Sequence, residues 1–226
     1  MKDFRYIFIL TFMALFCSCK EYLDVVPDNV ATIDYAFRDR ISAQKFLFTC
    51  YSYLPHIGNP TNDPAIMSSD EWWAHEELYY YQFVGNFDAF NIKRNRQNVN
   101  DPLLNYWQGF RQGTDLYQGI RDCNIFLENV HKVGPDLPEG ERRRWTAEVK
   151  FLKAYFHYYL LRMYGPVPLI KENFPIDTEV ESIRIFRSPF DECVSFIGDL
   201  INEAVPDLPL IISDVTNELG RITQPI

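Results

Sequence analysis

The sequence predicts an all-α fold, in which helices pair as antiparallel hairpins and long irregular loops join them. Three observations support this. From Glu141 to Tyr164, apolar residues recur at steps of four and three, the period of one helix face. A second apolar row lies beside the first, so this central helix needs neighbours on two or more sides. Helix hairpins in series favour an α-solenoid, although the sequence shows no strict repeat period.

The composition bounds the kind of protein. A chain of 226 residues that is 47% hydrophobic can bury the core of one sizeable domain. Its net charge of -9 argues against nucleic acid as a partner. Aromatic residues make up 16% of the chain, and they can serve as core or as stacking surface. Burial is the more frequent role of such residues.

The N-terminal residues predict export. Lys2 and Arg5 precede a short apolar run, as in a signal peptide, and that run is too short to span a bilayer as a stable helix. Ser18 stands before Cys19 and is the small residue that bacterial lipoprotein processing requires. We therefore predict a lipoprotein signal peptide over 1–18 and acylation of Cys19. Ordinary secretion with cleavage nearby is the alternative.

A tether and a helical domain are expected to follow. Residues 19–33 are predicted to form a lipidated tether, and 34–226 a helical domain. Four helices are expected in it, over 34–53, 101–130, 141–164 and 188–205. In the first, Phe37, Ile41, Phe48 and Tyr51 mark the inner face.

Local signals set the ends of the later helices. Gly109 and Gly113 would lie inside the second helix at a cost of about 1 kcal/mol each, offset by close approach of a neighbour. Gly165 and the proline after it end the central helix. Ser188 begins a capping box with proline at the first helical position.

The central helix carries only a narrow polar strip, Lys150, Lys153 and His157. His157 is predicted to be a hydrogen-bonded helix residue. The four histidines lack metal-ligand spacing, and the motifs of nucleotide-binding and hydrolase sites are absent. We therefore predict no catalytic residue, no metal and no cofactor.

Three cysteines beyond the signal region are widely spaced and odd in number: Cys50, Cys123 and Cys193. Buried thiols are the favoured interpretation, and a disulfide framework is not supported.

Residues 61–102 are the least helical part of the chain. Within them, SSDEWWAHEELYYY (68–81) combines two tryptophans, three tyrosines and four carboxylates. Two of these carboxylates could form a glycosidase pair only if they lay about 5–10 Å apart across a sugar ring. A solvated acidic loop is the more common explanation.

Four ordered motifs resemble the SusD/RagB family, outer-membrane lipoproteins of the Bacteroidetes. They are CKEYLD (19–24), WQG through GIRDCN (107–124), KFLKAYF with GPVPL (150–169) and GRITQP (220–225). The resemblance implies a tetratricopeptide-like helical fold. Family members are substantially longer, and 220–226 resembles the start of another core helix, so the domain is expected to be incomplete at its C-terminal end.

The resemblance implies a non-catalytic, surface-exposed lipoprotein that captures glycan and delivers it to a SusC-like TonB-dependent transporter. Sugars are bound by flat aromatic platforms and fixed hydrogen-bond partners. We expect Trp72, Trp73 and Tyr80 as platforms, and Asp70 and Glu71 as acceptors from hydroxyl groups. Adjacent residues cannot share a face, so the favoured alternative has one of the two tryptophans facing outward and the other packed inward. Two alternatives remain: a lid or structural partner of the transporter without glycan selectivity, and a surface glycosidase.

Overall fold

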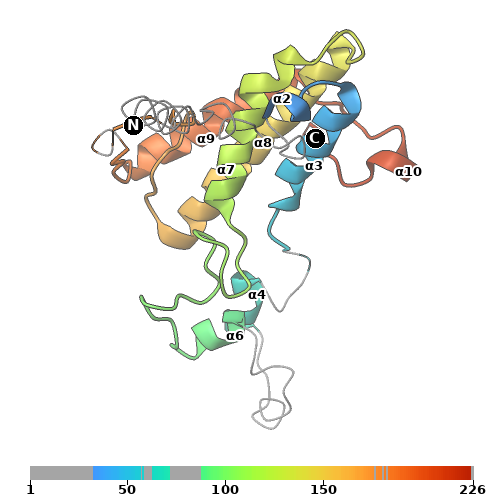
Figure 1. Ribbon diagram of the computed structural model, residues 1–226. Coiled ribbons are helices and arrows are strands. Elements are labelled where there is room, and N and C mark those ends of the chain that lie inside the picture. Colours follow the sequence, from blue (N-terminus) through green and yellow to red (C-terminus); the bar gives the residue numbers. More distant parts are fainter. Residues whose placement is uncertain are drawn as a thin grey trace, which may run out of the picture. The chain divides into compact units, whose positions relative to one another are not determined.

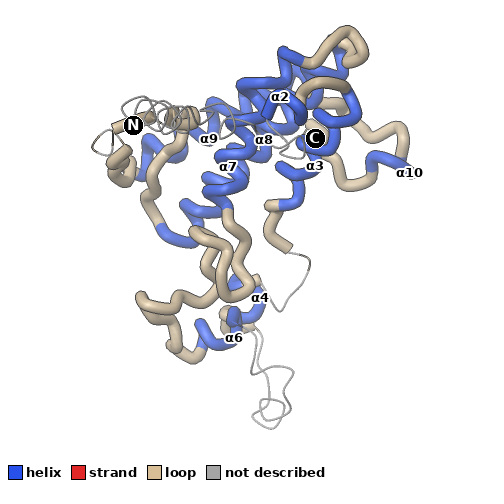
Figure 2. Tube along the Cα trace, in the orientation of Figure 1, coloured by secondary structure: helices blue, strands red, loops and turns tan. Residues whose placement is uncertain are grey.

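A computed structural model describes residues 33–224, except 57, 59–62, 72–87, 176, 180 and 182. In this part of the chain the structure is helical and has no strand (Figures 1 and 2). The helices are α2 (Ile33–Ala36), α3 (Arg40–Ser52), α4 (Pro64–Met67), α6 (Asp88–Lys93), α7 (Leu116–Asn129), α8 (Glu139–Tyr164), α9 (Phe190–Ala204) and α10 (Val215–Glu218), with 3-10 turns η2 (Val130–Lys132) and η3 (Val205–Asp207). The all-α prediction is confirmed.

The longest described helix, α8, is the centre of the core, as the sequence predicts. It packs against α7, α9 and α3, and Figure 1 shows α7 alongside it. Trp145, Val149, Leu152, Phe156 and Tyr159 are all fully buried. Gly165 ends the helix in a left-handed conformation (φ 68°), and its N–H donates to the carbonyl of Leu161 at 2.9 Å.

The helix predicted over 101–130 is wrong in its first half. α7 begins only at Leu116, where Asp115 caps it by accepting from the N–H of Gln118 at 2.9 Å. Residues 101–115 form turns instead. Close approach does occur on α7, but at Gly119. A Cβ there would lie 2.9 Å from the Cβ of Tyr53 and 3.1 Å from the ring of Phe156.

The first predicted helix is interrupted, and it turns a different face inward. Asp39 accepts from the N–H of Ser42 at 2.7 Å and starts α3 as a separate helix after α2. The buried face is Ala43, Leu47 and Cys50, whereas Ile41 is 63% exposed and Phe48 is also exposed. Small residues at two of the three buried positions let α3 pack closely on α7 and α8.

The start of α9 also differs from the prediction. Pro189, not Ser188, stands at the N-cap, and no side chain caps this end. The N–H of Ser188 instead donates to the carbonyl of Val167 at 3.0 Å, which joins the chain before α9 to the segment after α8. The buried face is Cys193, Ile197, Leu200 and Ala204.

All three described cysteines, Cys50, Cys123 and Cys193, are free and buried, as predicted.

The polar strip of α8 is less exposed than predicted, because α9 and the segment after α8 cover it. Lys153 is 4% exposed and its Nζ donates to the carbonyl of Lys171 at 2.6 Å. His157 is fully buried. Its Nδ1 lies 2.8 Å from the carbonyl oxygen of Lys153, and the N–H of Ile170 donates to its Nε2 at 3.4 Å. This confirms that His157 is a hydrogen-bonded helix residue.

Burial lowers the pKa of His157 to about 4, and the nearby Lys153 ammonium acts in the same direction. The unfolded chain has the ordinary histidine pKa of about 6.5. The difference between the two pKa values makes the free energy of unfolding depend on pH. The protein keeps its full stability above pH 6.5 and loses stability as the pH drops towards 4, by about 2 kcal/mol at pH 5. We expect urea unfolding to show that extra loss between pH 7 and pH 5 in the wild type and not in His157→Gln. An equal loss in both proteins would contradict the prediction.

A buried charge network joins α3, α8 and the residues after α10. Glu148 is fully buried and accepts from Arg144 at 3.0 Å, Arg221 at 2.9 Å and the Tyr51 hydroxyl at 2.9 Å. The Tyr51 hydroxyl in turn accepts from the N–H of Ile222 at 3.2 Å. Paired and hydrogen-bonded in this way, the buried carboxylate fixes the residues after α10 onto the helical core.

Candidate functional site

Two short helices, α4 and α6, hold the described ends of the aromatic loop together. The Ser68 hydroxyl donates to the carbonyl of Ala89 at 2.6 Å, and Lys93 Nζ donates to the carbonyl of Ser69 at 2.5 Å. We call the residues 68–71 and 88–93 the loop base. Asp70 and Glu71 are exposed at its edge. The other residues predicted to form the site, Trp72, Trp73 and Tyr80, lie outside the described residues, as does Cys19.

A tight hairpin over 104–113 lies next to the loop base. The N–H of Leu104 donates to the carbonyl of Arg111, and the N–H of Asn105 to that of Phe110, each at 3.0 Å. The Asn105 side chain accepts from two further backbone N–H groups, at 3.0 and 3.1 Å. Gly113 is required here, because a Cβ at this position would overlap the backbone carbonyl of Asn105.

Arg111 connects the 104–113 hairpin to the loop base. Its guanidinium lies 3.2 Å from Asp88 at the start of α6 and 3.5 Å from Asp101. Burial raises the pKa of Asp88, and the Arg111 charge opposes that rise. The ion pair therefore places the exposed arm of the hairpin, residues 108–112, beside the residues that flank the predicted aromatic loop.

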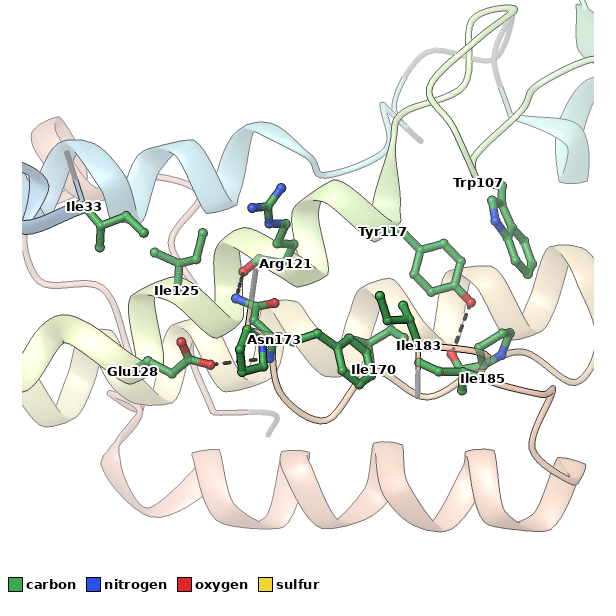
Figure 3. Close-up of a pocket in the computed structure, with 13 residues that line it drawn as sticks. Ile33, Trp107, Tyr117, Arg121, Ile125, Glu128, Ile170, Asn173, Ile183 and Ile185 are labelled. Carbon is green, nitrogen blue, oxygen red and sulfur yellow. Dashed lines mark hydrogen bonds between the residues drawn. The ribbon is translucent and has the colours of Figure 1, made fainter. Parts of the chain in front are cut away.

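A second feature is an apolar groove of about 840 Å³ along α7, which we call the α7 groove (Figure 3). It is lined by Ile33, Trp107, Tyr117, Arg121, Ile125, Glu128, Pro168, Ile170, Asn173, Phe174, Pro175, Ile183 and Ile185. Trp107 and Tyr117 lie at one end, with ring centroids 4.8 Å apart, and Glu128 lies towards the other. The Tyr117 hydroxyl donates to the carbonyl of Pro168 at 3.1 Å, and Asn173 donates to the carbonyl of Arg121 at 3.1 Å.

Neither the hairpin nor the groove was predicted from the sequence. The hairpin was missed because Trp107 to Gly113 were placed inside a helix, and the groove because its lining comes from segments far apart in the chain. Two mid-helix glycines within seven residues were the available signal for a turn.

In the described residues, no group of three or more His, Cys, Asp or Glu side chains is placed to hold a metal ion. No helix in that part is both long and apolar enough to cross a membrane.

Solved structures define the class of fold. The protein titled BT4246 superposes with a TM-score of 0.65 at 29% identity, over 82% of this chain and 29% of that chain. A laminarin binding SusD-like protein gives 0.63 at 25% identity, over 83% and 38%. A SusD-like protein from Bacteroides fragilis NCTC 9343 gives 0.62 at 24% identity, over 89% and 34%. The fold is therefore that of the SusD-like proteins, and this chain spans about a third of the length of these relatives.

The family itself is shown by sequence. The model of the SusD-like family described as "Starch-binding associating with outer membrane" matches residues 21–219. The chain belongs to this family, as the four motifs predict. The family model is described by starch binding and one solved relative by laminarin binding, and neither is described as an enzyme, in agreement with the predicted lack of catalysis. No curated protein matches the chain.

Proposed function

We propose that this chain is part of a non-catalytic, glycan-binding lipoprotein of the outer membrane. The observation that carries the proposal is the family match over 21–219, a family described by starch binding and association with the outer membrane. A relative at 25% identity is described as laminarin binding, which supports a polysaccharide as the ligand. In this proposal the glycan is captured at the cell surface and delivered to a SusC-like TonB-dependent transporter.

The proposed binding site is the aromatic loop of residues 70–81. Trp72, Trp73 and Tyr80 would stack on the apolar C–H faces of sugar rings, and Asp70 and Glu71 would accept hydrogen bonds from hydroxyl groups. Asp70 and Glu71 are exposed at the edge of the loop base, as this role requires. The hydrogen bonds between the residues that follow α4 and those of α6 support the proposal, because closing the base of a loop reduces the entropy lost on binding.

Binding is tested by affinity electrophoresis of the full-length chain in gels that contain soluble starch, laminarin, xylan or polygalacturonate. The detergent for the predicted lipid anchor should have no sugar head group, because such a head group would compete for the site. Slower migration in at least one polysaccharide gel, relative to a gel without polysaccharide, is the expected result. Unchanged migration in all four gels would contradict the proposal.

Membrane attachment through Cys19 gives a separate prediction. Acyl chains bind a bilayer through burial of CH₂ groups, at about 0.8 kcal/mol each. We expect the wild type in the membrane fraction of the expressing bacterium and Cys19→Ala in the soluble fraction. Cys17→Ala is the matched control and should remain with the membrane. If Cys19→Ala also remained there, Cys19 would not be the anchor.

The α7 groove favours a second candidate function, that of a transporter partner without glycan selectivity. Its lining is mainly aliphatic and aromatic, which is typical of contacts with protein rather than with sugar hydroxyl groups. Two results together would favour this function over glycan capture. The wild type would copurify with a transporter and Ile170→Glu would not, and the wild type would migrate unchanged in every polysaccharide gel.

A further inference from the structure

One arm of the 104–113 hairpin presents an aromatic ring to solvent. Phe110 is 63% exposed, and its neighbours Gln108 and Arg111 are also exposed. By contrast, Leu104, which pairs with Arg111, and Tyr106 are buried on the opposite arm of the hairpin, and the N–H of Tyr106 donates to the Tyr164 hydroxyl at 2.9 Å. The hairpin is thus anchored in the core through one arm and exposes a phenyl ring on the other.

The backbone of the hairpin is strained and strongly constrained. Leu104 (φ 48°), Arg111 (φ 52°) and Gln112 (φ 65°) all adopt the left-handed conformation, which is unfavourable for residues with a side chain. Such strain persists only where the surrounding structure enforces it, and it concentrates at functional sites. Here the two cross-hairpin hydrogen bonds and the buried Asn105 side chain enforce it. The backbone that carries Phe110 is therefore fixed before any ligand arrives.

The side chains around Phe110 suit a neutral sugar. A phenyl face can stack on the C–H face of a pyranose ring, and the Gln108 amide can both donate to and accept from hydroxyl groups. Arg111 is paired with two carboxylates, those of Asp88 and Asp101. The net charge of these three side chains together is therefore negative. A uronate would be repelled there, whereas an uncharged hexose would not.

We propose that the exposed arm of the 104–113 hairpin is a glycan-binding subsite, in which Phe110 stacks on a neutral pyranose ring and Gln108 binds its hydroxyl groups. The inference rests on the proposed function and adds to it a contact outside the 70–81 loop. The Arg111–Asp88 ion pair places this subsite beside the loop base, so one polysaccharide chain can contact both.

The test uses the full-length chain and the same four polysaccharide gels. We expect Phe110→Ala to weaken binding to soluble starch or laminarin about tenfold, since a lost stacking contact amounts to roughly one factor of ten. Phe110→Trp should restore binding, and Gln108→Ala should weaken it less than Phe110→Ala does. Phe186→Ala is the matched control, because Phe186 is an exposed phenylalanine (85%) outside the hairpin.

The outcomes separate this inference from the proposed function. If the wild type binds starch or laminarin and Phe110→Ala and Gln108→Ala bind equally well, the subsite is wrong and the proposed function stands. If the wild type binds none of the four polysaccharides, both are overturned. Binding to polygalacturonate alone would support glycan capture but contradict a subsite for neutral sugars. If the variants unfold at the same temperature as the wild type, their weaker binding does not come from a loss of folded protein.

Discussion

Replacing Trp72 and Trp73 together by alanine should remove most of the affinity of this protein for polysaccharide. If both indoles stack on sugar rings, each contributes about a factor of ten to affinity, and the double variant should bind roughly a hundredfold more weakly. Isothermal titration with the polysaccharide that slows the wild type most would measure this loss directly. The hydrogen bonds that close the loop base involve neither residue, so we expect the base to remain closed in the double variant.

The single variants distinguish two arrangements of these tryptophans. Adjacent residues in an extended segment point to opposite sides, so one ring can face the ligand while the other packs inward. In that case one single variant loses affinity and the other loses stability. Tyr158→Ala is the matched control, since Tyr158 is an exposed aromatic residue (47%) on α8. Unchanged affinity in the double variant would exclude both residues as platforms.

Glu148→Ala should strongly destabilise the folded chain. It would leave Arg221, whose side chain is only 5% exposed, without its buried partner. Removing one member of a buried ion pair costs about 3–5 kcal/mol, and Arg221 would keep only its second pair, with Glu218 at 2.9 Å. Urea unfolding at pH 7 of the wild type and the variant would give this difference.

A double-mutant cycle tests the mechanism of that loss. Glu148→Ala combined with Arg221→Met should cost clearly less than the sum of the two single variants, because no buried charge is then left alone. Glu203→Ala is the control: it breaks the Lys150–Glu203 pair, in which the carboxylate side chain is 57% exposed, and should cost at most about 1 kcal/mol. Additive costs at Glu148 and Arg221 would show that the two side chains do not act as a pair.

Polar contacts between distant segments hold the proposed binding surface to the helical core. The Glu148 network fixes the residues after α10 to α3 and α8. The loop base, the 104–113 hairpin and the end of α8 are connected by the Arg111–Asp88 pair and the bond between Tyr106 and Tyr164. The proposed binding residues therefore extend from a base that is fixed to the longest described helix.

The sequence alone determined the features that depend on regular periodicity and on local end signals. The apolar rows of α8 predict its burial, and Gly165 marks its end, because both depend on residues close together in the chain. The antiparallel pairing of α7 with α8 follows from the short turn between them. The four motifs were sufficient to identify the family.

Only the tertiary structure decided the parts in which distant residues replace local preferences. The hairpin over 104–113 exists because backbone hydrogen bonds, the Asn105 side chain and Tyr164 stabilise left-handed residues that no helix period reveals. The buried face of α3 was set by how closely Ala43 and Cys50 let it approach α7 and α8. Likewise, the strip predicted to be polar on α8 became buried because α9 and the segment after α8 supplied partners for Lys153 and His157. In each case the deciding interaction joins residues far apart in the sequence, and a pattern of neighbours cannot show it.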